Sequence, residues 1–419
     1  MPTINGRRRV VVTGLGVVCP IGNSVDAMWE AAIAGRSGIR RLTLVDPTDY
    51  PAQVGGEVQD FDPTAYMERR DARRMARFSQ FAVAAARQAV EQAGLDLEAL
   101  DRTRAGVLCG SGGGGLPNSD EAMRIIVSRG GARVDPLFFA KMLPNMAAGN
   151  VSIQLGLQGY TSTVSTACAA GTQAIGEAAE VIRRGAAEVM VAGGTEAGIS
   201  ELGLAGFSAM RALTTSHNGD PERASRPFDR DRDGFAPSEG AGMFVLESLE
   251  HALARAARPL VEVTGYGVTS DASFLVAPPE DGAGAARAMQ AALANAGIEA
   301  GEVDYVSAHA TATEAGDIAE TRAIKSVFGE RAYEVPVSAM KSQIGHLLGG
   351  AGGVESVAAV QTILSGQIAP TVNLEHPDPE CDLDYVPNVA RRAEVRTVMK
   401  NSFGFGGQNA VLILRAFAG

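Results

Sequence analysis

Cys168 is the residue of this sequence whose surroundings best suit nucleophilic chemistry. It lies in Val-Ser-Thr-Ala-Cys-Ala-Ala-Gly-Thr, a segment that begins at Val164 and runs from a predicted strand into a predicted helix. Unpaired N–H groups and the helix dipole favour a thiolate at such a helix N-terminus, and small neighbours leave the sulfur open. The alternative is a buried structural cysteine, which most free cysteines are. The other three fit that alternative: Cys19, Cys109 and Cys381.

Two histidines and a lysine have a comparable setting. His309 follows a predicted strand and opens His-Ala-Thr-Ala-Thr, while His346 comes five residues after Lys341 and precedes a run of glycines. A lone histidine near glycine is usually structural, but two of them, with a cysteine at a helix start and a nearby lysine, indicate a reactive site. The remaining histidines lie among polar residues or in turns and are expected at the surface: His217, His251 and His376.

Two glycine-rich turns suggest different chemistry. The turn over 401–409, Asn-Ser-Phe-Gly-Phe-Gly-Gly-Gln-Asn, precedes the last predicted strand and can direct backbone N–H groups at a developing oxyanion. The pattern Gly110-x-Gly112-x-x-Gly115 follows a predicted strand and matches a dinucleotide-binding motif. Pro117, together with the lack of an expected helix and of a ribose-binding acid after these glycines, argues against that function. Nucleotide binding is therefore not predicted.

These residues need a scaffold to bring them together. Strands are predicted over 10–15, 104–109, 164–167 and 189–192, and helices over 78–93 and 169–184, each helix being followed by a glycine. Alternation of strands with helices is typical of an α/β fold built in layers.

The second half of the chain repeats the order of elements in the first. The segment 164–168, with its helix, has a counterpart at 337–341, so Cys168 and Lys341 occupy equivalent places. A helical segment over 248–257 would close the first unit. We therefore predict two similar halves, 1–257 with the nucleophile and 258–419 with both histidines. The alternative is chance resemblance between Ala-rich α/β segments.

Charge and composition exclude several classes of function. The 419 residues carry 37 Lys and Arg against 48 Asp and Glu, a net charge of −11, so no nucleic-acid partner is expected. An apolar fraction of 46% buries a core easily. Four cysteines without metal-ligand spacing argue against disulfides and zinc, and for a reducing, cytoplasmic location. No secretory signal is recognised at the N-terminus.

The segment 142–176 contains no charged residue over 35 positions. Proline, asparagine, glutamine and hydroxyl residues interrupt it, so it does not suit a membrane span, and no membrane association is expected. We expect this segment to be buried against protein.

Several motifs, in this order, resemble the β-ketoacyl-ACP synthases of the thiolase superfamily. The principal ones are Ser165-Thr-Ala-Cys, His309-x-Thr-x-Thr, Lys341-Ser-x-x-Gly-His and Asn401-Ser-Phe-Gly-Phe-Gly-Gly, with support from Arg226-Pro-Phe-Asp, Arg232-Asp-Gly-Phe and Pro278-Pro-Glu-Asp-Gly-Ala. The resemblance runs from Val10 to about Arg415. Type II synthases are the most similar members, and ketosynthases of type II polyketide pathways are close behind.

The resemblance implies a thiolase-like α/β fold of five layers, αβαβα, with two halves related by a pseudo-twofold axis. It implies a homodimer, whose charge-poor face would include 142–176. The implied reaction is a decarboxylating Claisen condensation of malonyl-ACP with an acyl chain held as a thioester. Acyl carrier protein is the implied partner, and no metal or cofactor beyond its phosphopantetheine is implied. The resemblance leaves open whether the product is a fatty acid or a polyketide and which chain length is preferred. It also leaves open whether the dimer contains two copies of this chain or a related second subunit.

The resemblance also assigns roles to single residues. Cys168 would carry the acyl group, while His309 and His346 would hold malonyl and stabilise the enolate. Lys341 and Glu355 would form a buried supporting pair, Thr311 and Thr313 would bind pantetheine, and backbone N–H groups of Cys168 and Phe405 would form the oxyanion hole. Phe405 and Phe403 would gate the site, and Gly113 and Phe138 would line the acyl pocket. The residues implied in carrier-protein docking are Arg70, Arg73, Arg74, Arg133 and Arg211.

The sequence departs from the family pattern beside the predicted site. Ala310, Ala312 and Glu314 stand where Gly, Ser and Pro are usual, and Ser273-Phe274 replaces an aromatic–His pair. These departures bear on substrate preference and carrier-protein fit, not on the reaction class. A thiolase would have a second cysteine in the 401–409 turn, and a non-catalytic chain-length subunit would lack Cys168, so both alternatives are disfavoured.

Overall fold

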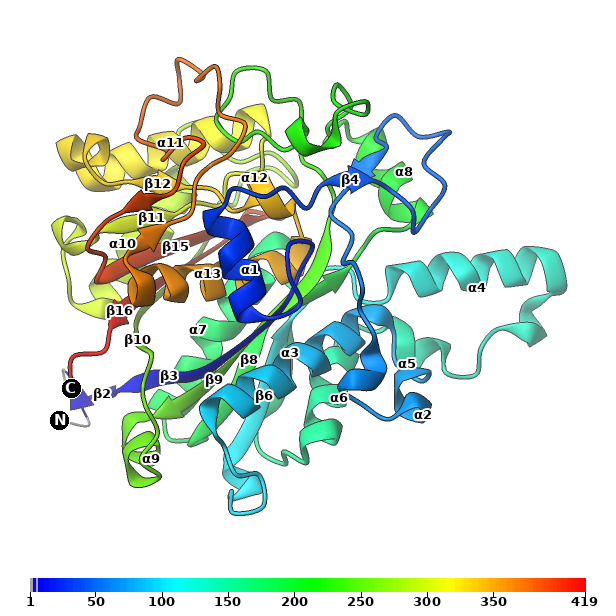
Figure 1. The fold of residues 1–419 in the computed structure, drawn as a ribbon, viewed down its shortest axis with the longest axis horizontal. Coiled ribbons are helices and arrows are strands. Elements are labelled where there is room, and N and C mark those ends of the chain that lie inside the picture. The colour runs from blue at the N-terminus through cyan, green and yellow to red at the C-terminus, as the bar shows by residue number, and fades with distance from the viewer. Residues whose placement is uncertain (1–2, 5–6) are drawn as a thin grey trace.

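The protein is organised around a ten-stranded sheet, seen here in a computed structural model that describes residues 3–4 and 7–419 (Figure 1). Its spatial order is β12-β11-β15-β16-β10-β3-β9-β8-β6-β7. The strands of the N-terminal half are β3 (Val10–Val18), β6 (Ala105–Gly110), β7 (Thr161–Val164), β8 (Val189–Ala197) and β9 (Glu239–Ser248). Those of the C-terminal half are β10 (Val261–Ser270), β11 (Tyr305–Ser307), β12 (Val337–Ser338), β15 (Thr397–Gly404) and β16 (Gln408–Ala416).

Short strand pairs and helices complete the chain. The pairs are β1 (Thr3–Ile4) with β2 (Arg7–Arg8), β4 (Arg40–Arg41) with β5 (Val54–Gly55), and β13 (Gln367–Ile368) with β14 (Arg391–Arg392). The helices are α1 (Val25–Ile33), α2 (Arg69–Ala72), α3 (Arg77–Ala93), α4 (Leu116–Arg129), α5 (Phe138–Met142), α6 (Met146–Leu155), α7 (Ala170–Arg183), α8 (Glu201–Ala209), α9 (Leu249–Ala254), α10 (Ala283–Ala296), α11 (Glu314–Phe328), α12 (Lys341–Ile344) and α13 (Ala351–Ser365).

The two halves of the sheet have the same topology. Numbered by chain order within each half, both have the spatial order 1-5-4-2-3. In both halves the second strand is parallel to the third and fourth, and the fifth is antiparallel to its neighbours. The halves meet where β3 pairs with β10, with Val12 opposite Val261. The prediction of an α/β fold with two similar halves is confirmed.

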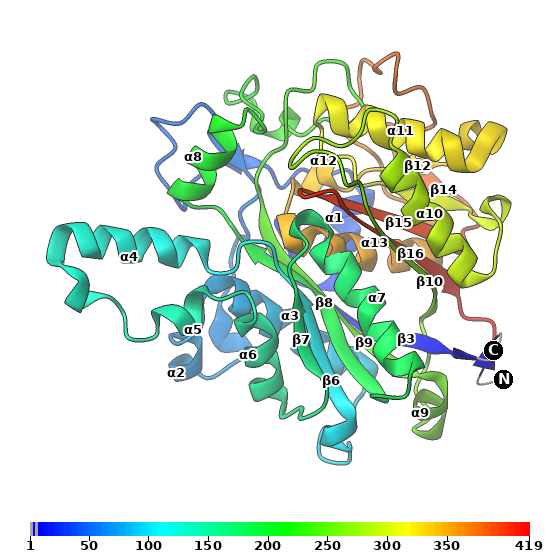
Figure 2. The same ribbon diagram turned by 180° about the vertical axis from the view of Figure 1, so that it is seen from behind.

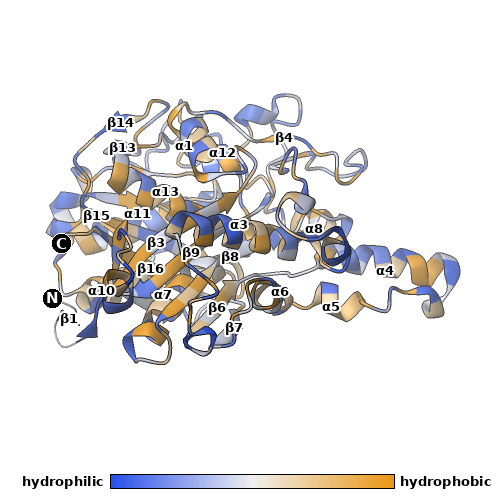
Figure 3. Ribbon diagram, turned by 60° about the horizontal axis from the view of Figure 1, so that its bottom comes forward, coloured by the Kyte–Doolittle hydropathy of each residue, from blue (hydrophilic) through white to orange (hydrophobic). Residues whose placement is uncertain are grey.

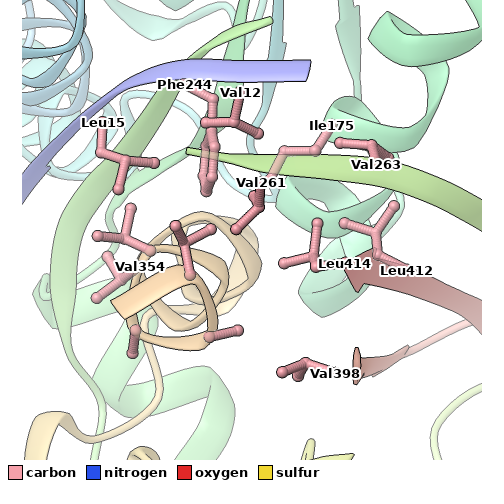
Figure 4. Packing of buried hydrophobic residues seen from close by; sticks show 14 of the residues in the cluster. Val12, Leu15, Ile175, Phe244, Val261, Val263, Val354, Val398, Leu412 and Leu414 are labelled. Carbon is pink, nitrogen blue, oxygen red and sulfur yellow. The ribbon is translucent and has the colours of Figure 1, made fainter. Parts of the chain in front are cut away.

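Helices form three layers around the two halves of the sheet. Helices α7 and α13 pack between the halves, α3 and α6 cover the outer face of the first, and α10 covers the outer face of the second with α11 beside it (Figures 1 and 2). In the central layer, Ile175 and Val354 meet side chains from both halves, including Phe244 and Leu412 (Figure 4). This arrangement gives the predicted αβαβα layers.

Small residues allow α3 to approach β3 very closely. A Cβ added at Gly16 would lie 1.9 Å from the carbonyl oxygen of Ala85, and one at Gly14 would lie 2.0 Å from that of Ala89. Side chains at these two positions would therefore push the helix from the sheet. This close packing is the physical reason for much of the glycine and alanine in the sequence.

The helix α4, with α5 after it, projects from the body of the protein (Figure 3). The expectation of no helix after the glycines was wrong, because α4 begins at Leu116 and accommodates Pro117 in its first turn, where a missing N–H is tolerated. Large apolar side chains are exposed on and beside α4, α5 and α6: Met123, Ile126, Val127, Leu137, Phe139, Leu143, Ile153 and Tyr160. The segment 142–176 is therefore only partly buried within one chain. Across the described residues, the helices are too short or too polar to cross a bilayer.

Candidate active site

Cys168 lies in a tight turn between β7 and α7. The strand predicted over 164–167 is found over 161–164, and Ala167, with φ +47°, lies in the turn that leads into the helix. The Cys168 side chain is buried with only 6% exposure. Burial raises the pKa of its thiol to about 12, against the opposing effects of Lys341 and of the backbone N–H groups of Phe405 and Cys168. The helix start alone thus does not produce the thiolate that the sequence suggested.

Both predicted histidines lie beside this cysteine. The Nε2 atom of His346 is 3.0 Å from Cys168 Sγ, and the rings of His309 and His346 are 5.6 Å apart at an interplanar angle of 85°. His309 follows β11, and His346 follows α12. Residues separated by 178 positions in the chain therefore meet at one point, where the C-terminal ends of β7 and β11 approach each other.

A buried ion pair fixes the orientation of His309. Lys341 donates to Glu355, to the His309 carbonyl oxygen at 2.6 Å and to His309 Nδ1 at 3.4 Å. An ammonium group can only donate, so Nδ1 is an acceptor and the proton of the neutral ring is on Nε2. Lys341, paired with Glu355, thus contacts His309 on the Nδ1 side of its ring.

Both rings are held in the neutral form. Burial, followed by the positive charges of Lys341 and Lys400, lowers the pKa of His346 well below its usual value. The pKa of His309 is also lowered well below its usual value by burial, by Lys341 and by the neighbouring histidine. Neutral imidazoles with a proton on Nε2 are hydrogen-bond donors, so this pair can stabilise negative charge on a bound oxygen atom.

Glu320 is a supporting residue that the sequence analysis missed. Its carboxylate accepts from the backbone N–H groups of His309 and Ala310, at 2.8 and 2.7 Å, and from the Asn401 side chain at 3.0 Å. Ala310 has φ +30° and Ala312 φ +66°, so this loop has a conformation that favours glycine. The signal in the sequence was an acidic residue on the buried face of an otherwise amphipathic helix, α11.

The turn between β15 and β16 covers the cysteine. A Cβ at Gly404 would lie 2.6 Å from the Thr166 carbonyl oxygen, so the turn approaches the nucleophile's backbone closely. The ring centroids of Phe403 and His309 are 5.6 Å apart, and those of Phe405 and Phe207 are 6.4 Å apart. The structure therefore brings this predicted turn next to Cys168 and His309.

A cavity of about 710 Å³ joins these groups. Of the predicted residues, those that line it are Cys168, His309, His346, Thr311, Thr313, Phe403, Phe405 and Gly113. The hydroxyls of Thr311 and Thr313 are 2.9 Å apart. Phe138, on α5, does not line the cavity of its own chain. Glu196, which the sequence analysis missed, accepts from the backbone of Gly112 and Gly113 at the cavity wall, and burial raises its pKa to about 7.

The predicted docking arginines lie outside the cavity. Arg70 belongs to α2, Arg73 and Arg74 follow it, and Arg133 and Arg211 lie after α4 and α8; all five are exposed. Arg70 Nε is 3.9 Å from Asp71, which leaves its guanidinium largely in solvent. Their exposure makes them available to an acidic partner.

One cluster among the described residues has the composition of a cation site. The ligating atoms of Asp229, Asp231 and His376 lie within 4.8 Å of one another. However, the Asp229 carboxylate already accepts from the backbone N–H groups of Asp231, Glu375 and His376. The cluster also lies apart from the residues that line the cavity. Its hydrogen bonds account for it as part of the loop structure.

Two family models match nearly the whole chain. Residues 7–252 match the β-ketoacyl synthase N-terminal domain, and residues 260–375 match the β-ketoacyl synthase C-terminal domain.

Curated relatives and solved structures agree with these matches. A 3-oxoacyl-acyl-carrier-protein synthase 2 of Synechocystis sp. is 47% identical over 98% of this chain and 99% of its own length. The enzyme of the same name from Staphylococcus aureus strain COL is 47% identical over the same shares. Among solved structures, an ishigamide ketosynthase/chain length factor has a TM-score of 0.93 and 38% identity, covering 98% of this chain and 100% of that one. A type II polyketide ketosynthase in complex with its acyl-carrier protein has a TM-score of 0.89 and 34% identity, with the same coverage.

Proposed function

This chain belongs to the β-ketoacyl synthase family, and from that premise we propose that its cavity condenses malonyl-ACP, with loss of CO2, with an acyl chain carried on Cys168. The protein is a condensing acyltransferase of the 3-oxoacyl-ACP synthase type. The observation that carries the proposed residue roles is the contact of Cys168 Sγ with His346 Nε2, 3.0 Å apart, beside a second neutral histidine in one cavity.

In the first step Cys168 takes the acyl group from the carrier protein. The sulfur attacks the thioester carbonyl as its proton is transferred to the departing pantetheine sulfur, and the Nε2–H of His346, 3.0 Å from Sγ, would donate a hydrogen bond to the Cys168 sulfur. Backbone N–H groups of Cys168 and Phe405, both directed at the sulfur, would stabilise the oxyanion that forms on the acyl carbonyl. Because burial opposes a free thiolate, proton transfer coupled to attack suits this site.

In the second step the two histidines act on malonyl-ACP. Their Nε2 protons would bind the malonyl thioester oxygen, and the bond from the α-carbon to the carboxylate breaks to release CO2 and leave an enolate. The enolate carbon then attacks the acyl carbonyl on Cys168, forming a C–C bond and breaking the C–S bond, and the sulfur leaves as a thiolate that takes up one proton from solvent to restore the thiol. Thr311 and Thr313 line the cavity with their hydroxyls 2.9 Å apart, which supports a role for them in binding the pantetheine arm. These steps need no bound cofactor beyond the carrier's own arm.

Fatty acid elongation is the pathway we propose, because the curated relatives are 47% identical over nearly their whole length. The high TM-scores of ketosynthases from polyketide systems support a second candidate, the catalytic ketosynthase of a type II polyketide pathway. Turnover of saturated acyl-ACP substrates through repeated cycles with a fatty acid reductase and dehydratase set would favour the first. Acceptance of only β-keto or polyene chains would favour the second.

Intact-mass analysis tests the roles of the cysteine and the histidines. After incubation with acyl-ACP, the protein should gain one acyl mass, which Cys168→Ala should abolish and the control Cys109→Ala, in the core strand β6, should retain. Cys168→Ala should still decarboxylate malonyl-ACP, whereas His309→Ala should not. Full condensation by Cys168→Ala would refute the assignment, as would full activity of a folded His309→Ala.

We also propose two protein contacts for an enzyme acting in the cytoplasm. The exposed arginines on and after α2 would bind the acidic carrier protein, as a related ketosynthase complex with its carrier supports. The exposed apolar side chains of α4, α5 and α6 would be covered by a second copy of the chain. Ile153→Glu, on α6 at 71% exposure, should therefore lower the measured molar mass, whereas Leu364→Glu on α13 should not.

A further inference from the structure

Lys400 is a buried lysine next to the site that no step above uses. It lies on β15, between the buried residues Met399 and Asn401, and its exposure is 0%. A charged side chain is rarely buried completely unless it is paired, so this lysine needs a physical explanation. The strand places it opposite Ser307 of β11, two residues before His309.

The Lys400 ammonium group is paired with the Glu355 carboxylate, which favours the charged form, whereas burial lowers the pKa of Lys400. Its neighbours are Glu355 Oε2 at 2.8 Å, the Asn401 carbonyl oxygen, and Ser402 Oγ at 3.1 Å. All three oxygen atoms can accept a hydrogen bond, and the Ser402 hydroxyl can itself donate one to the Thr172 hydroxyl, 2.7 Å away. An ammonium group at Lys400 can donate one proton to each of these three oxygen atoms.

The two oxygens of Glu355 are thus shared between two lysines. Lys341 donates to Oε1 and to the His309 carbonyl oxygen. Lys400 forms an ion pair with Oε2 and donates to the Asn401 carbonyl oxygen, in the segment that leads to Phe403 and Phe405. The ion pair at Oε2 and the hydrogen bond at Oε1 restrain the Glu355 carboxylate, which would help to hold Lys341 against His309 Nδ1. Two cations on one carboxylate also leave an excess of positive charge behind the rings.

We propose that Lys400 is a positioning residue of the condensing reaction: it clamps Glu355 in place for Lys341 and supplies the positive charge that keeps His309 and His346 neutral. This inference rests on the proposed function. The titratable groups that face the two rings come from every neighbouring element: Lys341 on α12, Lys400 on β15, Glu355 on α13, Glu320 on α11, Cys168 before α7 and Glu196 on β8. The positive charge of Lys400 contributes to lowering the pKa of both histidines.

Removal of this charge should change the pH dependence of catalysis. Without Lys400 the histidine pKa values rise, so the rings become protonated at higher pH and stop serving as neutral donors. The rate of malonyl-ACP decarboxylation should fall at acid pH, and this fall is the acid limb of its pH profile. In Lys400→Met the acid limb should move to higher pH, by on the order of one pH unit. Lys400→Arg retains a positive charge, so its acid limb should lie at the same pH as that of the wild type.

Each pH profile is normalised to its own maximum, so partial unfolding does not move it. Met399→Ala is the matched control: it removes a neighbouring buried side chain from the same strand, should lower Tm, and should leave the limb unmoved. An unmoved limb in folded Lys400→Met would overturn the proposal. So would failure of both Lys400→Met and Lys400→Gln to fold while Lys400→Arg folds, since the lysine would then serve folding alone.

Titration of the histidine ring protons by NMR gives a second readout that does not depend on turnover. His309 and His346 should titrate at higher pH in Lys400→Met than in the wild type. If the wild type does not decarboxylate malonyl-ACP but the ring pKa values still rise, the proposed function fails while the electrostatic role of Lys400 stands. If the wild type is active and the ring pKa values do not move, only the role of Lys400 fails.

Discussion

Replacing Gly113 by isoleucine should shorten the acyl chains that the enzyme accepts. Gly113 lines the cavity, and a Cβ there would lie 3.6 Å from Glu196 Oε1 and 4.0 Å from Leu116 Cβ, which are ordinary contacts. Its φ is not positive, unlike that of Gly114 at +59°, so the backbone permits a side chain. The absence of a side chain at 113 therefore provides space in the cavity and is not required by the turn.

The magnitude follows from the volume that isoleucine would occupy. Four added carbon atoms displace about three methylene groups of a long acyl chain, each worth roughly 0.8 kcal/mol of buried apolar contact. The loss of about 2.5 kcal/mol corresponds to roughly 70-fold in kcat/KM for chains that reach Gly113. Chains too short to reach it should be unaffected.

The assay is kcat/KM for acyl-ACP substrates of graded length, with Gly113→Ala as the control of small volume. Gly113→Ile should lose the long chains selectively, and Gly113→Ala should lose little. A uniform decrease at all lengths would refute the reasoning, because the glycine would then serve the backbone geometry around Glu196.

Three further predictions concern docking, backbone strain and pH. Arg70→Glu combined with Arg74→Glu should raise KM for acyl-ACP and weaken its salt dependence; unchanged kinetics at low salt would exclude these exposed arginines from docking. Ala310→Gly should raise the free energy of unfolding by about 0.5–1 kcal/mol in denaturant titration, because φ +30° strains alanine; a lower stability would contradict this. Burial would raise the pKa of Glu247, but hydrogen bonds, led by that from Arg255, outweigh it and bring the pKa to about 2. A lowered pKa stabilises the fold above the unfolded value of roughly 4.3, so Tm should fall as pH decreases from there towards 2, and less steeply in Glu247→Gln.

Local sequence carried much of the information about the fold. The helix α3 was recognised because its apolar spacing ends at Gly94, which adopts φ +57° in the structure. The repeat of elements was visible because both halves need the same order of strands and helices to build the same topology. The strand predicted over 164–167 shares only Val164 with β7, and the left-handed turn at Ala167 has no local signal in an alanine. The helix α4 was missed because proline at its second position resembles a helix breaker.

The sequence by itself indicated Cys168, His309, His346 and Lys341 as candidate reactive residues from their motifs, and its resemblance to a known family added Glu355 as the partner of Lys341. These lie in short segments whose spacing is set by local turns, and local patterns record such spacing. What only the tertiary structure decided is how the groups behave once they meet. Burial raises the thiol pKa where the helix start alone favoured a thiolate, and Glu320 and Lys400 reach the site from elements remote in sequence. Desolvation and long-range contacts depend on the packing of the whole chain, so no local pattern records them.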